Sequence, residues 1–184
     1  AYIPKDRFYL YRSQWNKKDE TLHILPHWNW EGREGETTPV FVYTSYPCAE
    51  LFVNGISQGK RTFAEPDGQT PCLGEKAMKR FRLMWDEVTY QPGELKVVAY
   101  DPEGQPVDEK TIHTAGKAAT IKLTPDRKII KADGEDLCFI NVSLTDKYGN
   151  PVPCDSRLVK VKVSGAGSFK AIANGDPTCL ESFQ

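Results

Sequence analysis

The chain has 184 residues, of which 39% are hydrophobic and 27% charged, with a formal net charge of -1 and a pI of about 6.4. This composition is typical of a globular protein, and the length suits one large or two small domains. It excludes a nucleic-acid-binding protein that relies on a basic patch. It also contains no run of about 18 apolar residues that could form a transmembrane helix.

The N-terminal segment is predicted to be a short helix. Residues 4–15, PKDRFYLYRSQW, begin with a proline that suits a first helical turn, and Phe8, Tyr11 and Trp15 follow at roughly helical spacing. The segment lacks the charged and then apolar pattern of a signal peptide. Because so short a helix is marginal in water, we expect residues 1–18 to be poorly ordered or to lie across a sandwich or a neighbouring chain.

The following residues predict β-strands. Short apolar or β-branched runs occupy residues 22–25 and 39–46. The clearest hairpin covers residues 49–63, where Asn54-Gly55 supplies the two positive φ angles of a type I′ turn.

A polar loop over residues 64–76 leads to an alternating segment. In that segment Phe81, Leu83 and Trp85 are expected on one face, and Arg80, Arg82 and Met84 on the other. Turns at Pro92-Gly93 and at residues 102–106 separate two further strands. About seven strands in some 95 residues are typical of an immunoglobulin-like sandwich.

Residues 115–120, AGKAAT, read as a linker, and a second β series follows it. Val159, Val161 and Val163 alternate with lysines, as in a strand with one buried face. About five strands in some 65 residues fall short of the roughly 100 residues of such a sandwich. The fold class is therefore predicted to be all-β, with two immunoglobulin-like β-sandwich domains in tandem, a short helix before them, and a C-terminally incomplete second domain.

The cysteines do not form a recognisable framework. An odd count without a C-x-x-C pair argues against a zinc site and a full disulfide set, although a single disulfide stays open. Most of the thiols are expected to be buried as small hydrophobic groups. The five cysteines are Cys48, Cys72, Cys138, Cys154 and Cys179.

The segment HILPHWNWEGREGE, residues 23–36, carries the main candidate site. Trp28 and Trp30 would face the same side of an extended backbone and could form a sugar platform with Glu31, but a tryptophan in a sandwich is more often core. Paired carboxylates could cleave a glycosidic bond, yet glutamates in a Gly-rich loop favour a solvated turn. The histidines of the segment, His23 and His27, lack a third metal ligand.

The other motifs point to structure rather than chemistry. His113 stands alone, and the acid in residues 64–68 has no partner acid. The acidic run at residues 133–136 lacks the regular spacing of a calcium loop, which favours a solvated turn. No G-x-S-x-G, Gly-rich phosphate loop or Cys/His nucleophile pair is recognisable. No catalytic residue, cofactor or metal is therefore predicted.

Several long blocks in order resemble the C-terminal part of bacterial glycoside hydrolase family 2 enzymes, with most similarity to β-galactosidases of Bacteroides-type gut bacteria. The blocks are PKDRFYLYRSQW, HILPHWNWEGREGETTPVFVYTS, AELFVNGISQGK, YQPGELKVVAY, ADGEDLCFINVSLTDKYGNPVP and VSGAGSFKAIANGDPT. The resemblance implies that residues 1–19 are the end of the last helix of a catalytic barrel, residues 20–116 an accessory sandwich, and residues 119–184 the start of another. The catalytic glutamates would lie upstream, and the chain would be truncated at both ends.

The resemblance implies a non-catalytic accessory role in a periplasmic or extracellular β-galactosidase. The expected partner is the catalytic barrel of the same polypeptide, with the accessory domains packing on it and shaping substrate access. Self-association through an open sheet edge is a further expectation, whereas nucleic acid and membrane are not expected partners. Two alternatives remain, a carbohydrate-binding module that uses Trp28 and Trp30, and an active hydrolase, which the lack of paired acids disfavours.

Overall fold

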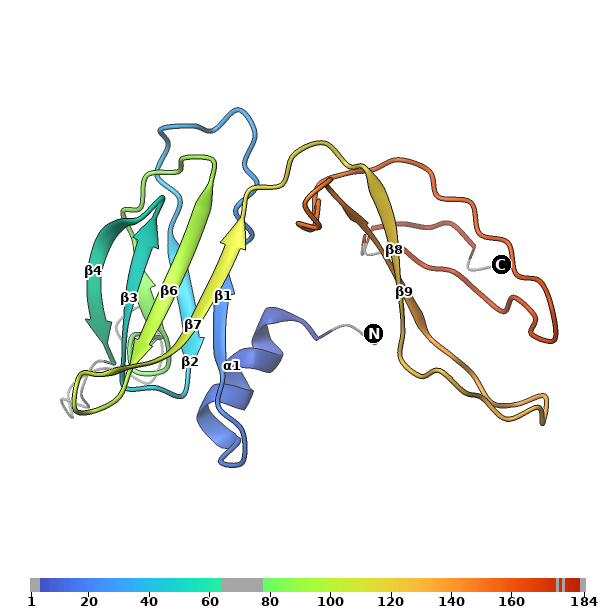
Figure 1. The fold of residues 1–184 in the computed structure, drawn as a ribbon, viewed down its shortest axis with the longest axis horizontal. Coiled ribbons are helices and arrows are strands. Elements are labelled where there is room, and N and C mark those ends of the chain that lie inside the picture. Colours follow the sequence, from blue (N-terminus) through green and yellow to red (C-terminus); the bar gives the residue numbers. More distant parts are fainter. Residues whose placement is uncertain (1–3, 64–77, 175, 177, 183–184) are drawn as a thin grey trace.

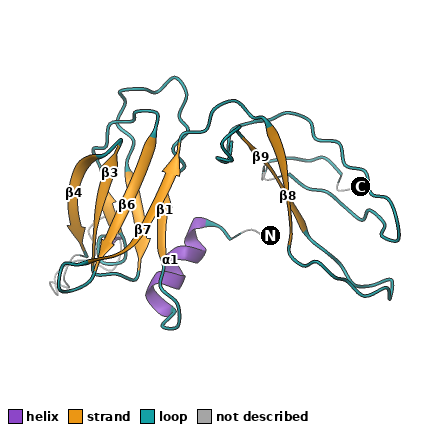
Figure 2. Cartoon of the chain, viewed as in Figure 1, coloured by secondary structure: helices purple, strands orange, loops and turns teal. Residues whose placement is uncertain are grey.

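The computed structural model describes residues 4–63, 78–174, 176 and 178–182. These residues form one helix and nine strands, paired antiparallel, which confirms the all-β prediction (Figures 1 and 2). None of them belongs to a helix long and apolar enough to cross a membrane. The elements are α1 (Asp6–Trp15), β1 (Leu22–Leu25), β2 (Val40–Thr44), β3 (Cys48–Val53), β4 (Ile56–Thr62), β5 (Leu83–Trp85), β6 (Glu94–Tyr100), β7 (Pro106–His113), β8 (Thr120–Pro125) and β9 (Ile140–Thr145).

The first seven strands form two sheets with a shared core. One sheet has the order β1-β2-β5 and the other β4-β3-β6-β7. Alternate side chains of both sheets point inward and are removed from water, which supplies the main driving force for folding. The strand count agrees with the predicted seven, while the finer immunoglobulin-like assignment stays a prediction. The buried cluster contains Ile24, Trp28, Val40, Val42, Ala49, Leu51, Val53, Leu83, Trp85, Val88, Tyr90, Leu95 and Val97.

The hairpin between β3 and β4 follows the prediction. Asn54 and Gly55 have φ angles of 49° and 80°, and Val53 pairs with Ile56 across the turn. A turn with two positive φ angles matches the right-handed twist of the strands, so this dipeptide fixes the register. The Asn54 side chain also accepts a hydrogen bond from the backbone N–H of Glu94 (2.7 Å), which ties the hairpin to β6.

Helix α1 lies across the outer face of the β1-β2-β5 sheet. The Tyr9 ring stacks on the His23 ring at 3.9 Å, and His23 Nε2 lies 2.8 Å from Asp6 Oδ1. The helix leaves three aromatic side chains in solvent, with Phe8 and Tyr11 each 50% and Trp15 74% exposed. This arrangement agrees with the expectation that the segment lies across a sandwich without burying its rings.

The strand predicted around residues 80–85 is shorter than expected. Only Leu83, Met84 and Trp85 form β5, and Leu83 and Trp85 join the core as predicted. Phe81 is 46% exposed, because its N–H and that of Arg82 both bond to the carbonyl of Met78 in a turn. The expected inward position of Phe81 is therefore wrong. The predicted loop over residues 64–76 lies outside the described residues.

The second unit, residues 120–174, contains one hairpin of two strands. In β8 and β9 each polar residue pairs with a polar residue and each apolar residue with an apolar one, so one face of the hairpin is polar and the other apolar. The prediction of about five strands is wrong for the described residues, and residues 158–163 form no strand. The alternation of valine and lysine at residues 158–163 predicts a segment with one apolar and one polar face. It does not show which strand would supply the partners for the backbone hydrogen bonds. The apolar face consists of Ile121, Leu123, Pro125, Ile140, Val142 and Leu144.

The four described cysteines are free thiols and none is fully buried, which overturns the expectation that most are core residues. Cys154 is exposed and the others are partly exposed. Cys72 lies outside the described residues. Among the described cysteines, Cys48 is the first residue of β3 and occupies an outward, partly exposed position, and the others lie in connections, which is why composition alone misplaced them.

Replacing Gly93 by alanine should destabilise the seven-stranded unit by about 3 kcal/mol, combining positive-φ strain with the loss of an Asn54 hydrogen bond. Gly93 has a φ of +134°, and an added Cβ would lie 2.0 Å from Asn54 Oδ1. Urea unfolding followed by tryptophan fluorescence measures the effect. Gly104→Ala is the control, because Gly104 also has a positive φ, +83°, but an added Cβ there would have open space around it. Equal losses for both variants would contradict the role of the Asn54 contact.

Candidate functional site

Trp28 belongs to the core of the first unit. Its side chain is 1% exposed, and its ring meets the Tyr90 ring edge-on with centroids 5.0 Å apart. The indole N–H donates to the carbonyl of Gln91 at 3.0 Å. A buried tryptophan whose N–H is satisfied packs favourably and presents no free ring face. The expectation that Trp28 contacts carbohydrate is therefore corrected, whereas the core alternative is confirmed for this residue.

The backbone of Trp28 and the side chain of Asn29 hold the start of the linker. The Trp28 carbonyl accepts a hydrogen bond from Thr114 Oγ1 at 2.5 Å. Asn29 bonds Ala115 twice, its Nδ2 donating to the Ala115 carbonyl and its Oδ1 accepting from the Ala115 N–H, both at 3.2 Å. The side-chain amide therefore replaces the strand partner that Ala115 lacks beyond the end of β7.

Trp30 is half-buried at the margin of the core. Its backbone N–H donates to the Tyr90 hydroxyl at 3.2 Å. The His27 ring stacks on the indole at 4.4 Å, and the Arg33 guanidinium lies 5.2 Å from its centroid. The indole N–H is buried without a hydrogen-bond partner in the described part of the chain. Trp30 is thus more available than Trp28, but two neighbours already lie against its ring.

The glutamates of the segment are held within their own loop. Glu36 accepts from Arg33 Nε at 2.8 Å, and Glu34 accepts from the Gly32 N–H at 3.3 Å. Glu31 is exposed. Glycoside hydrolysis needs two carboxylates that flank a bond, one of them with a raised pKa. The geometry instead uses these groups to shape a turn, in agreement with the solvated-loop alternative.

The two histidines of the segment serve different neighbours. His23 contacts α1, whereas His27 lies 4.0 Å through Nε2 from the Sγ of Cys154 in the second unit. Cys154 also contacts the Asn29 carbonyl at 4.0 Å. Desolvation lowers the pKa of His27, so its neutral form is favoured. Sequence reasoning missed this Cys/His pair because 127 residues separate its members.

Asp146 fastens the other end of the linker. Its carboxylate accepts from the Gly116 N–H at 3.0 Å, from the backbone N–H groups of Tyr148 and Asn150, each at 2.9 Å, and from Asn150 Nδ2 at 3.1 Å. Desolvation by itself would raise the pKa of Asp146, but these hydrogen bonds outweigh it and lower the pKa from 3.8 to about 2. The aspartate therefore joins the linker to the turn after β9.

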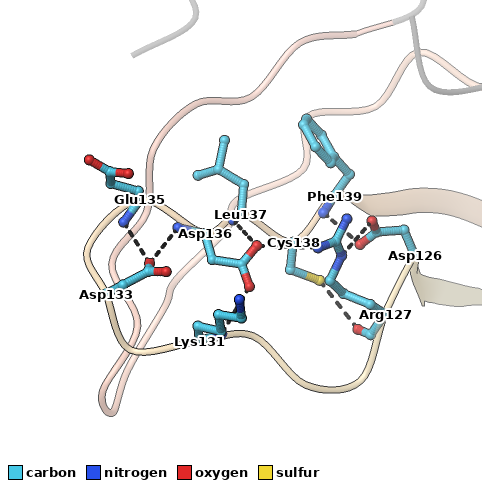
Figure 3. Close-up of polar contacts among 9 residues, drawn as sticks. All are labelled: Asp126, Arg127, Lys131, Asp133, Glu135, Asp136, Leu137, Cys138 and Phe139. Carbon is cyan, nitrogen blue, oxygen red and sulfur yellow. Dashed lines mark hydrogen bonds and ion pairs between the residues drawn. The ribbon is translucent and has the colours of Figure 1, made fainter.

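The acidic run at residues 133–136 organises the connection between β8 and β9 (Figure 3). Asp133 accepts from the N–H groups of Glu135 and Asp136, which lower its pKa. Asp136 accepts from the Lys131 N–H at 2.9 Å and from Arg127 at 3.2 Å. The carboxylates are directed at protein donors, as the solvated-turn alternative predicts. Within the described residues no group of three metal-ligating side chains occurs.

Two domain families match the chain. Residues 35–108 match a domain of unknown function, DUF4982, and residues 121–184 match glycoside hydrolase family 2 C-terminal domain 5. The gap between the matched ranges contains the linker that Asn29 and Asp146 hold. The predicted boundaries at residues 20–116 and 119–184 stay predictions.

The relatives and the solved structures that match this chain are glycosidases. The chain is 40% identical to β-galactosidase BoGH2A of Bacteroides ovatus over 100% of its own length and 20% of that protein. It is 30% identical to a β-glucuronidase of Bacteroides fragilis over 60% of its length and 14% of that protein. A β-glycosidase from Bacteroides vulgatus matches with a TM-score of 0.67 and 32% identity, covering 82% of this chain and 17% of that one. A glycosyl hydrolase family 2 member from Bacteroides cellulosilyticus matches with a TM-score of 0.64 and 34% identity, covering 80% of this chain and 20% of that one. The chain therefore spans about a fifth or less of these relatives.

Asn29→Ala should release the start of the linker, because it removes both bonds to Ala115. The free energy of local opening at the Ala115 amide should fall by about 1–3 kcal/mol. Amide hydrogen exchange measures this change residue by residue, with the Leu51 and Val97 amides inside the sheet as internal references. Asn29→Asp is the matched variant, since it keeps the acceptor for the Ala115 N–H and loses only the donor to the Ala115 carbonyl, so it should retain more protection at Ala115 than Asn29→Ala does. Unchanged exchange at Ala115 in both variants would show that Asn29 does not hold the linker.

The Asp146 contacts should weaken only in strong acid. The lowered folded-state pKa means that their contribution to stability is complete above the ordinary value near 3.8 and is lost as the pH falls towards about 2. The Gly116 amide resonance should titrate with a midpoint near 2. In Asp146→Asn this titration should disappear. A midpoint near 3.8 in the unmodified chain would show that the hydrogen bonds do not hold the carboxylate.

Proposed function

Because the chain belongs to the C-terminal region of glycoside hydrolase family 2 proteins, as its two matched domains and its relatives show, we propose that it is a non-catalytic accessory module of a β-galactosidase. Its role is to connect sandwich units and to pack them on the catalytic domain of the same polypeptide. The similarity to the Bacteroides ovatus β-galactosidase supports this choice of parent activity.

The observation that carries the proposal is that the segment Trp28-Asn29-Trp30 and its neighbours are engaged in internal contacts. The residues with the strongest catalytic or binding signature either fill the core, as Trp28 does, or hold the linker, as Asn29 does. The nearby glutamates Glu34 and Glu36 accept hydrogen bonds within their own loop. A segment so committed to internal contacts favours a structural task over bond cleavage.

The exposed face of α1 supports a docking role. Phe8, Tyr11 and Trp15 remain in solvent although the helix is held on its other side by Tyr9 and Asp6. Exposed aromatic rings of this size commonly mark interaction surfaces. In the longer polypeptide this face would contact the catalytic domain and influence access to its cleft. We place the parent enzyme in the periplasm or outside the cell, on the basis of its Bacteroides relatives.

The chain alone should not hydrolyse p-nitrophenyl β-D-galactoside, because Glu34 and Glu36, in the segment with the strongest catalytic signature, accept hydrogen bonds within their own loop instead of flanking a substrate bond. Release of nitrophenol should equal the rate without protein. Activity that survives repurification and is abolished by Glu31→Gln, Glu34→Gln or Glu36→Gln would overturn the proposal.

In the full-length polypeptide, Trp15→Ser should lower the thermal midpoint of the catalytic domain by a few degrees, since about 1 kcal/mol shifts the midpoint of a large domain by roughly 2–4 °C. Its kcat should remain unchanged. Tyr148→Ser, which alters an aromatic residue 77% exposed in the second unit, is the matched control. Equal effects of both changes would argue against α1 as the docking face.

A further inference from the structure

We propose that the hollow beside Trp30 and Phe41 binds one neutral pyranose residue of a glycan. The hollow has a volume of about 290 Å³ and lies on the outer face of the β1-β2-β5 sheet, where Leu25 pairs with Phe41. Helix α1 covers the other end of this face, around His23 and Tyr43. The volume is at the lower limit of ligand pockets, about 300 Å³, so it suits a single sugar ring. This inference goes beyond the accessory role and does not depend on it.

The walls combine apolar surface with unused polar groups. Leu25, Pro26, Pro39 and Phe41 supply the apolar part. Trp30 and Thr38 also line the hollow, and their Nε1 and Oγ1 atoms are buried without a hydrogen-bond partner in the described chain. A buried donor without a partner is costly, so such groups are usually satisfied by a ligand or by water. A sugar offers both an apolar ring face and hydroxyl acceptors.

The charge around the hollow favours a neutral ligand over an acidic one. Arg33 is the cation that lines it, but its Nε is paired with Glu36 at 2.8 Å. Arg82 is a second cation near the hollow, with its guanidinium 4.4 Å from the centroid of the Phe41 ring, although it does not line the hollow. Glu31 and Glu34 lie in the same loop as Arg33 and Glu36, so three glutamates face two arginines around the hollow. A carboxylate on the sugar would therefore gain little from Arg33 and would meet repulsion from the loop.

The geometry also assigns a position to the sugar. His27 stacks on the Trp30 ring, and the Arg82 guanidinium lies 4.4 Å from the centroid of the Phe41 ring. The two prolines and the part of Phe41 that lines the hollow therefore form the surface available for packing. The Arg33 side chain lies over the Trp30 ring and is 43% exposed, so we expect a ligand at the indole to displace it. The site differs from the platform predicted from sequence, because Trp28 is excluded and Phe41 is included.

Indole N–H resonances test the proposal, because the chain has four tryptophans. Trp28 and Trp85 donate to the Gln91 and Gly59 carbonyls, so their signals serve as internal references. Titration of the ¹⁵N-labelled chain with methyl β-D-galactopyranoside or methyl β-D-glucopyranoside should shift the Trp30 signal saturably, with a dissociation constant on the order of 1 mM. Methyl β-D-glucuronide should bind more weakly. The exposed Trp15 signal should not follow the same curve.

Variants separate the hollow from general sugar contact. Phe41→Ala should weaken binding about tenfold, as expected when a packed ring face is lost. Arg33→Ala should retain or improve binding, and it serves as the second variant if Phe41→Ala does not fold. Tyr148→Ala should bind like the unmodified chain. No saturable shift of Trp30, an equal shift of Trp15, or tightest binding of the glucuronide would overturn the proposal.

Discussion

The burial of Trp28 is the constraint on which the rest of the junction depends. Its ring fills the core between the two sheets, and its N–H is satisfied by Gln91. The buried ring anchors the backbone at residues 28–29, from which the Trp28 carbonyl and the Asn29 side-chain amide bond to Thr114 and Ala115. Since a large buried aromatic group carries several kcal/mol, it can determine where these weaker hydrogen bonds form. The core of the first unit therefore specifies the starting point of the linker.

The same constraint explains why a segment with catalytic-looking composition has a structural role. Rings, carboxylates and imidazoles occur together at sugar-processing sites, but chemistry requires groups that remain free to meet a substrate. Here Asn29 bonds the linker, Glu36 bonds Arg33, and His27 lies between Trp30 and Cys154. Relatives that are five or more times longer than this chain have ample sequence elsewhere for the catalytic residues. The proposed accessory role requires only shape, stability and exposed contact faces.

Local signals in the sequence predicted much of the first unit. Asn54-Gly55 encodes its turn through positive φ angles, and the alternation of Leu83 and Trp85 encodes an inward face. Signals that depend on distant partners were not predictable. The contact between His27 and Cys154 and the bond from Gly116 to Asp146 arise only after the linker folds back. The alternation at residues 158–163 similarly specifies a face but no neighbouring strand, so the predicted strand is absent there.

Residual dipolar couplings of the backbone N–H groups test most directly whether the junction makes one body of the two units. Held by Asn29 at one end and Asp146 at the other, the linker should transmit orientation from the β3-β6 strands to the β8-β9 hairpin. The account predicts that couplings from both sets of strands fit a single alignment tensor on the structure described above. Two independent tensors, with much smaller couplings in β8 and β9, would contradict it.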